Sequence, residues 1–164
     1  MSDNYAVING KRIELTDAQA KVLGIETPKN PFERVKDGDT YYRVTEYGNV
    51  DDYVESGDYT DHNLYKTTNY FNDDSVAQQV ALHQLLYRKL LKFIYDYGCE
   101  DVTEWDRSNR HWTIRHGENL NKFFAYSQER YKAPDIYFSS EEAAERAIHE
   151  VVEPFVKEHP DFVW

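Results

Sequence analysis

Two segments of this sequence follow the same plan, and this repetition constrains the fold more than any other feature. Residues 70–81 and 137–148 align without a gap, and each begins with Tyr-Phe followed by short polar or acidic residues. Such residues cap helices, and a predicted hairpin precedes each segment. We therefore predict an internal duplication of a β-meander followed by a long helix. Chance recurrence of Tyr-Phe before a helix cap is the alternative interpretation.

Two long amphipathic helices are expected, one in each repeat. The first, residues 75–97, ends at Gly98 and has apolar side chains at helical spacing. Its stripe consists of Val76, Val80, Tyr87, Leu91 and Ile94, widened by Leu86, Leu90 and Phe93. The second, residues 140–158, begins with a capping box of Ser139 and Glu142. Pro154 should kink or restart it.

The strands are predicted from β-branched and aromatic content between turn residues. The expected strands are residues 40–45, 64–71, 109–116, 121–126 and 136–138. A small N-terminal hairpin is expected at residues 5–15 around Asn9-Gly10. A short helix capped by Thr16 should follow it.

These elements predict an α+β fold with three parts. Antiparallel hairpins are packed by two long helices, and the small hairpin and short helix form an N-terminal appendage. The appendage and linker span residues 1–30, the first β-meander plus helix unit spans 31–98, and the second spans 99–164.

Residues 46–61 form an acidic stretch that contains six carboxylates, three tyrosines and no Lys or Arg. Over residues 46–74 there are eight acids and one lysine, in a chain with a formal net charge of -11. Such charge disfavours binding to nucleic acid or to anionic membranes and favours a basic protein partner. A solvated hairpin face whose tyrosines pack on the core is the alternative.

The predicted partner-binding residues all lie in this stretch. Carboxylates along an extended hairpin can replace phosphates before a channel lined by Arg and Lys, and tyrosines add rigid contact area. The predicted contacts are Asp51, Asp52, Tyr53, Glu55, Asp58, Tyr59 and Asp61.

The sequence contains no motif that predicts catalysis, a metal site or a cofactor. The six histidines form no zinc-binding pattern, and the acidic stretch lacks the residue order of an EF-hand loop. No P-loop, dinucleotide fingerprint or G-x-S-x-G is present. We expect a non-enzymatic protein without cofactor or metal.

Cys99 is the only cysteine, which excludes an intrachain disulfide and is typical of a reducing cytosol. We expect no signal peptide and no membrane span. The predicted location is the cytosol.

Residues 7–11, 14–19 and 30–36, together with the two Tyr-Phe helix starts, resemble a loose group of small proteins. That group occurs in phages, prophages and other mobile elements of Gram-positive bacteria. The resemblance covers most of the chain and implies a phage accessory protein. Accessory proteins of this size and acidity include anti-CRISPR proteins and DNA mimics, which extends the resemblance by analogy.

The resulting hypothesis is an acidic phage protein that binds and inhibits a host nucleic-acid-handling defence protein, such as Cas9 or another nuclease. One alternative is a phage structural or assembly module that self-associates through its aromatic strands. Another is a small-molecule-binding protein that sequesters its ligand. The oligomeric state stays open.

Overall fold

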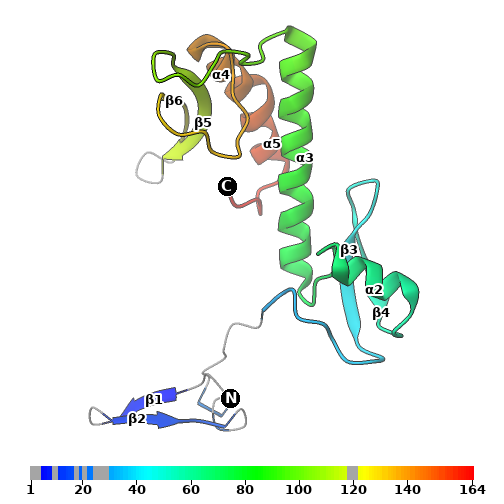
Figure 1. Cartoon of the computed structure of the whole chain (residues 1–164). Coiled ribbons are helices and arrows are strands. Elements are labelled where there is room, and N and C mark those ends of the chain that lie inside the picture. The colour runs from blue at the N-terminus through cyan, green and yellow to red at the C-terminus, as the bar shows by residue number, and fades with distance from the viewer. Residues whose placement is uncertain (1–4, 9–10, 17–18, 20–21, 24–29, 118–121) are drawn as a thin grey trace.

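The structure, a computed structural model, describes residues 5–8, 11–16, 19, 22–23, 30–117 and 122–164. Antiparallel hairpins and helices build it, which confirms the predicted α+β class (Figure 1). The strands are β1 (Tyr5–Ile8), β2 (Lys11–Glu14), β3 (Thr40–Val44), β4 (Val50–Val54), β5 (His111–Gly117) and β6 (Lys122–Gln128). The helices are α2 (Tyr59–Lys66), α3 (Asp74–Tyr97), α4 (Glu141–Ala147), the π-helical segment η1 (Ile148–Val152) and α5 (Glu153–Glu158).

The predicted N-terminal hairpin is confirmed, because β1 and β2 pair antiparallel with Ile8 opposite Lys11. The expected cap at Thr16 is also present, in a capping box with Gln19. Gln19 Oε1 accepts a hydrogen bond from the Thr16 N–H (2.9 Å), and Thr16 Oγ1 accepts one from the Gln19 N–H (3.4 Å). The turn at 9–10, most of the predicted helix at 17–23 and residues 26–29 of the linker lie outside the described residues.

The first unit is built around β3, which has a partner on each side. One side pairs with β4 through a turn in which Gly48 has a φ of 85°, a value that favours glycine. On the other side, Tyr42 and Phe71 exchange both backbone hydrogen bonds, at 2.7 and 2.9 Å. The Asn69 side-chain amide bonds both the N–H and the C=O of Val44. Both sides of β3 are therefore satisfied.

Helices cover the two faces of the β3–β4 ribbon. Val44 lies on the face toward α3, in a core cluster with Phe71, Ala77 and Ala81. On the opposite face, the buried Tyr41 stacks on Tyr70 with ring centroids 4.0 Å apart. Alternation of side chains along β3 accounts for this division.

The second unit contains the larger core. β5 pairs with β6, and the Phe138 N–H donates a hydrogen bond to the Trp112 carbonyl at 2.8 Å. The predicted strand at 136–138 is reduced to isolated bridges made by Phe138. Residues from α3, β5, α4, η1 and α5 share the core, including Leu90, Ile114, Ala147 and Phe155.

Helix α3 connects the two units (Figure 1). The Asp73 carboxylate caps its first turn, and Gly98, with a φ of 59°, ends it, close to the predicted bounds. Ala77 and Ala81 belong to the core of the first unit, whereas Leu86 and Phe93 belong to that of the second. One amphipathic helix therefore serves both cores.

The second predicted helix is present as α4, η1 and α5 in succession. Ser140 caps it in place of the predicted Ser139, by accepting a hydrogen bond from the Ala143 N–H. The Glu153 N–H bonds the Ile148 carbonyl five residues back, so the helix widens just before Pro154. A wide turn accommodates a residue that has no N–H to donate.

The predicted strand at residues 64–71 is wrong, because α2 occupies Tyr59–Lys66. The Asp58 side chain accepts a hydrogen bond from the Asp61 N–H, and the Asp61 side chain accepts one from the Asp58 N–H. This capping box favours the start of a helix at Tyr59, and its effect is stronger than the β preference of the residues that follow. Only Phe71 of the predicted strand pairs with the sheet.

The two predicted repeats have matching geometry at several positions. Tyr42 pairs with Phe71 as Trp112 does with Phe138. The helix caps Asp73 and Ser140 follow Phe71 and Phe138 at the same distance in sequence. These correspondences support the shared plan, and duplication as its origin stays a prediction.

Candidate functional site

The predicted partner-binding residues lie on β4 and at the start of α2, and they divide into exposed and internal groups. Asp51, Asp52, Asp58 and Tyr59 are exposed, and Tyr53 is half-buried. Glu55 and Asp61, in contrast, are only 4% and 3% exposed. The stretch is therefore not one continuous surface.

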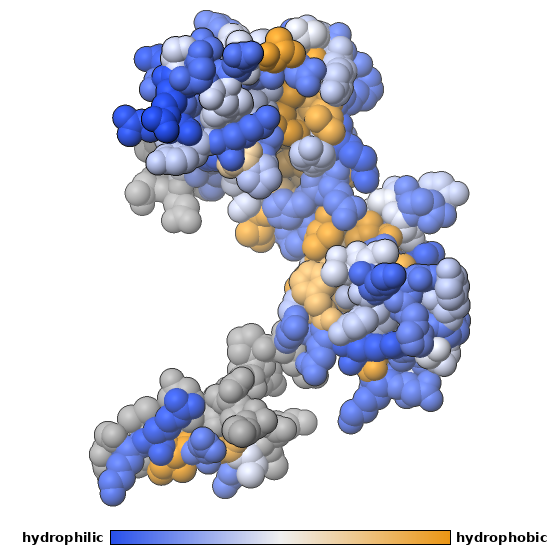
Figure 2. Space-filling view, in the orientation of Figure 1, coloured by the Kyte–Doolittle hydropathy of each residue, from blue (hydrophilic) through white to orange (hydrophobic). Residues whose placement is uncertain are grey.

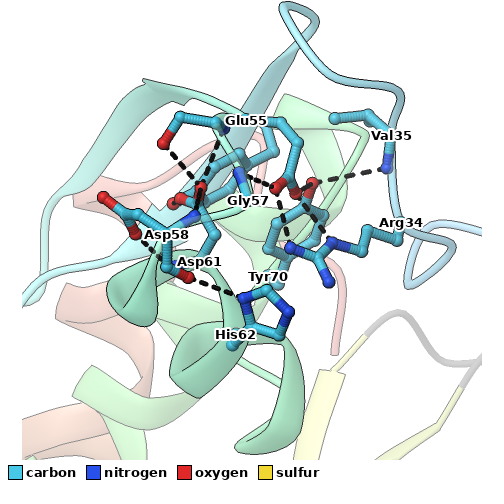
Figure 3. Close-up of polar contacts among 10 residues, drawn as sticks. Arg34, Val35, Glu55, Gly57, Asp58, Asp61, His62 and Tyr70 are labelled. Atoms are coloured by element: carbon cyan, nitrogen blue, oxygen red, sulfur yellow. Dashed lines mark hydrogen bonds and ion pairs between the residues drawn. The ribbon is translucent and has the colours of Figure 1, made fainter.

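Glu55 is the centre of a polar network that ties the segment before β3 to the first unit (Figure 3). Its carboxylate receives two hydrogen bonds from Arg34, Nε to Oε2 at 2.9 Å and Nη2 to Oε1 at 2.7 Å. The Tyr70 hydroxyl donates to Oε2 at 2.7 Å, and the Gly57 N–H donates to Oε1 at 2.8 Å. Every lone-pair direction of this buried carboxylate is thus used.

Asp61 occupies a neighbouring position with a different set of donors. The Tyr41 hydroxyl donates to its Oδ1 at 2.7 Å. Its Oδ2 accepts from the backbone N–H and hydroxyl of Ser56, at 2.8 and 3.0 Å, and from the Asp58 N–H at 3.2 Å. A buried carboxylate with this many donors is held ionised without a cation in direct contact.

The contacts shift the ionisation of both carboxylates and both tyrosines. The Arg34 hydrogen bonds, which outweigh burial, hold the pKa of Glu55 below its ordinary value. Burial would raise the pKa of Asp61, but donors led by Tyr41 and Ser56 lower it well below its usual range. Burial, followed by the bond to a carboxylate, raises the pKa of Tyr41 and of Tyr70. These groups therefore form a structural network.

Glu55 and Asp61 must accordingly be removed from the predicted partner-binding surface. Both carboxylates face inward because they satisfy backbone and tyrosine donors that would otherwise be unpaired. Asp58 is exposed but has a structural role as the cap of α2. The spacing of Asp58 and Asp61 is the sequence signal that could have revealed this arrangement.

Asp51 and Asp52 remain exposed, but they point to opposite faces of the ribbon. Asp51 lies opposite Arg43 and shares the α2 face with Tyr53, whereas Asp52 lies opposite Tyr42 on the α3 face. The Arg43 guanidinium donates to the Tyr53 hydroxyl at 2.7 Å and lies over its ring. No ion pair to Asp51 or Asp52 occurs among the described residues.

A second buried polar cluster, which the sequence analysis missed, lies in the corresponding part of the second unit. His111 is completely buried, and its Nδ1 is 2.6 Å from Asp101 Oδ2. Trp105 stacks on its ring at 3.6 Å. Burial would raise the pKa of Asp101, but hydrogen bonds from Thr103 and His111 lower it. His111 directly precedes Trp112, which pairs with Phe138. In the same way, Tyr41 directly precedes Tyr42, which pairs with Phe71.

A pocket of about 460 Å³ lies between α3, β5, residues 133–138 and the chain near Phe162. Its walls are mainly apolar, including Leu86, Ile114 and Phe138. Figure 2 shows hydrophobic residues gathered where α3 meets the second unit. At the pocket, Arg115 Nη1 donates to Asp135 Oδ2 at 2.6 Å.

Within the described ranges, no group of three or more His, Cys, Asp or Glu side chains could hold a metal ion. None of the described helices has the length and apolarity needed to cross a membrane.

We compared the chain with protein-family models, curated proteins and solved structures, and no match was found in any of the three.

Proposed function

We propose that this chain is a non-catalytic phage accessory protein that binds and inhibits a basic, nucleic-acid-handling defence protein of its host, of the anti-CRISPR or DNA-mimic type. It would act in the bacterial cytosol, without a cofactor. The single observation that carries the proposal is that the Asp51 and Asp52 side chains are exposed and form no ion pair within the described part of the chain.

Exposed tyrosines lie in the segments that precede and follow β4 in the sequence. Tyr47, in the turn before β4, is 83% exposed, and Tyr59, at the start of α2, is 82% exposed. Large aromatic side chains with a polar tip are common at the centres of protein interfaces. Their exposure, in the same part of the sequence as the unpaired Asp51 and Asp52, supports recognition of a partner that offers cations and apolar contact together.

The internal network supports the same proposal in another way. Because Arg34 neutralises Glu55 inside the unit, the hairpin is anchored at the end of β4, while no cation of the described residues pairs with Asp51 or Asp52. A rigid surface loses less entropy on binding than a flexible one. Inhibition by occupying a basic channel requires no chemistry from the chain.

Capture from the lysate of a defence-bearing host tests this proposal. The tagged chain should retain, in stoichiometric amount, a nuclease or other nucleic-acid-binding protein identified by mass spectrometry. Adding the chain should then inhibit DNA cleavage by that purified protein. Capture without inhibition, or no nucleic-acid-handling partner at low or moderate salt, would contradict the proposal.

The pocket favours a second candidate function, the binding of a small molecule. A largely apolar volume of about 460 Å³ with a few polar groups has the size and character of a ligand site. A ligand screen by thermal stabilisation tests it. Ala133→Trp would fill the pocket and abolish a ligand-induced shift, while Ala133→Ser would preserve it. A shift that is unchanged in Ala133→Trp would locate the ligand elsewhere.

A further inference from the structure

The outer edge of β4 has free backbone hydrogen-bonding groups. The hydrogen bonds at the two ends of the β3–β4 ribbon show which residues of β4 bond toward β3. The Thr45 N–H donates to the Asn49 carbonyl at 2.8 Å, and the Glu55 N–H donates to the Asp39 carbonyl at 3.0 Å. Inward hydrogen bonding alternates along an antiparallel strand. Asp51 and Tyr53 therefore bond toward β3.

The same alternation directs the N–H and C=O groups of Val50, Asp52 and Val54 away from β3. This assignment agrees with Tyr42, the residue opposite Asp52, which bonds outward to Phe71. Among the described residues, no hydrogen bond reaches the backbone of Val50, Asp52 or Val54 on this outer side. Val54 is 59% exposed, so solvent reaches the edge.

We infer that this edge binds an extended, basic segment of the partner as an added strand. Strand addition supplies backbone hydrogen bonds for affinity and side-chain contacts for specificity. The inference rests on the proposed function and specifies how the partner is held. It also accounts for Asp51 and Asp52 on opposite faces, since an added strand carries side chains on both faces of the ribbon.

The charge of the edge selects a basic segment over a second copy of the chain. Pairing β4 with another β4 would bring Asp51 and Asp52 close to the same carboxylates of the neighbour, and like charges directly opposite destabilise a sheet. Charged residues on an edge strand commonly prevent such self-pairing. Lysines or arginines in an alternating apolar segment lie on one face of the added strand, where they would instead meet the carboxylate on that face of the ribbon.

The probe for a direct test is a capped hexapeptide, Lys-Val-Lys-Val-Lys-Val, with Glu-Val-Glu-Val-Glu-Val as its charge control. Amide hydrogen exchange is followed by NMR in the full chain. The basic peptide should slow exchange at Asp52 and Val54 at least tenfold, and the acidic peptide should have no effect. Absence of binding, or binding without slower exchange at these amides, would overturn the inference.

Two variants of Asp52 distinguish the contribution of its outward backbone N–H to peptide binding from that of its carboxylate. Asp52→Pro and Asp52→Ala both remove the carboxylate, but only proline removes the outward N–H, and proline is tolerated at such edge positions. Asp52→Pro should bind the basic peptide at least tenfold more weakly than Asp52→Ala, with a similar melting temperature. Equal affinities would overturn the inference.

The proposed function has a separate point of failure. If the identified host partner binds Asp52→Pro and Asp52→Ala equally and is still inhibited, strand addition is wrong and the function stands. If no nucleic-acid-handling protein is inhibited, the function is wrong whatever the peptide does.

Discussion

Arg34 and Glu55 form a two-bond ion pair in which the carboxylate is 4% exposed and the guanidinium side chain 29% exposed. The pair links the segment before β3 to the loop after β4. Tyr70, which also bonds Glu55, stacks on Tyr41, which bonds Asp61. Arg34 is half-buried and Glu55 is buried. The pair anchors the β3–β4 hairpin, whose outer edge is proposed to bind the partner.

Replacing Glu55 by Gln should destabilise the chain. The amide cannot accept both Arg34 bonds, and the half-buried Arg34 guanidinium loses its anionic partner. Breaking a fully buried pair costs about 3–5 kcal/mol, and exposure of Arg34 reduces this to about 2 kcal/mol. Urea unfolding measures the change. Asp52→Asn, the exposed control, should change the free energy of unfolding by less than about 0.5 kcal/mol, and equal effects would refute the assigned role of Glu55.

Stability should fall in acid because of Glu55 and Asp61. Both have a folded pKa below the unfolded value, so their contribution is full above the unfolded pKa, about 4. It declines as pH falls below that value and is lost once pH passes the folded pKa. Thermal unfolding between pH 6 and pH 2 measures this. Asp61→Asn should flatten the acid decline; an unaltered pH profile in this variant would contradict the network.

The helix caps Asp73 and Ser140 should be equally important to their units. Each side chain accepts a backbone N–H in the first turn, and replacing such a cap by Ala costs about 1 kcal/mol. Asp73→Ala and Ser140→Ala should each lower the free energy of unfolding by about that amount. Ser139→Ala, at the position predicted from sequence, should be near neutral. A larger effect at Ser139 than at Ser140 would contradict the observed start of α4.

The Asn69 side chain should be needed to satisfy the backbone of β3 on the side away from β4. Its side-chain amide bonds both backbone groups of Val44, at 2.9 and 2.8 Å. Asn69→Ala leaves two polar groups of a buried residue unpaired, which costs about 1–3 kcal/mol. Hydrogen exchange at the Val44 amide should accelerate selectively. Unchanged protection at Val44 would show that another group satisfies it.

Much of the fold could be predicted from patterns that are local in sequence. Helix α3 was located within one residue because its apolar stripe, cap and terminal Gly98 all agree. The N-terminal hairpin and the β5–β6 hairpin were predicted from their turns and from β-branched and aromatic content, whereas β4 was not among the predicted strands. Residues 64–71 were assigned wrongly because Tyr and Thr favour strands, whereas the cap that decides the structure lies earlier, at Asp58.

The site was harder to predict because burial of a carboxylate depends on distant donors. Nothing near Glu55 in sequence indicates that Arg34 and Tyr70 converge on it. Likewise, the pairing of Asp101 with His111 requires the Trp105 segment to fold over β5. Asp51 and Asp52 were predicted on an extended hairpin, but their segment was not assigned as a strand, and only the ribbon's register separates their faces.

Affinity for the captured host partner in a charge-reversed variant tests the central claim most directly. Asp51→Lys with Asp52→Lys should weaken binding at least a hundredfold at low salt while preserving the melting temperature. The wild-type affinity should itself fall at moderate salt. The control Glu145→Lys with Glu158→Lys reverses two exposed acids of α4 and α5 and should bind as wild type. Equal affinity of both double variants would contradict the claim that the β4 acids hold the partner.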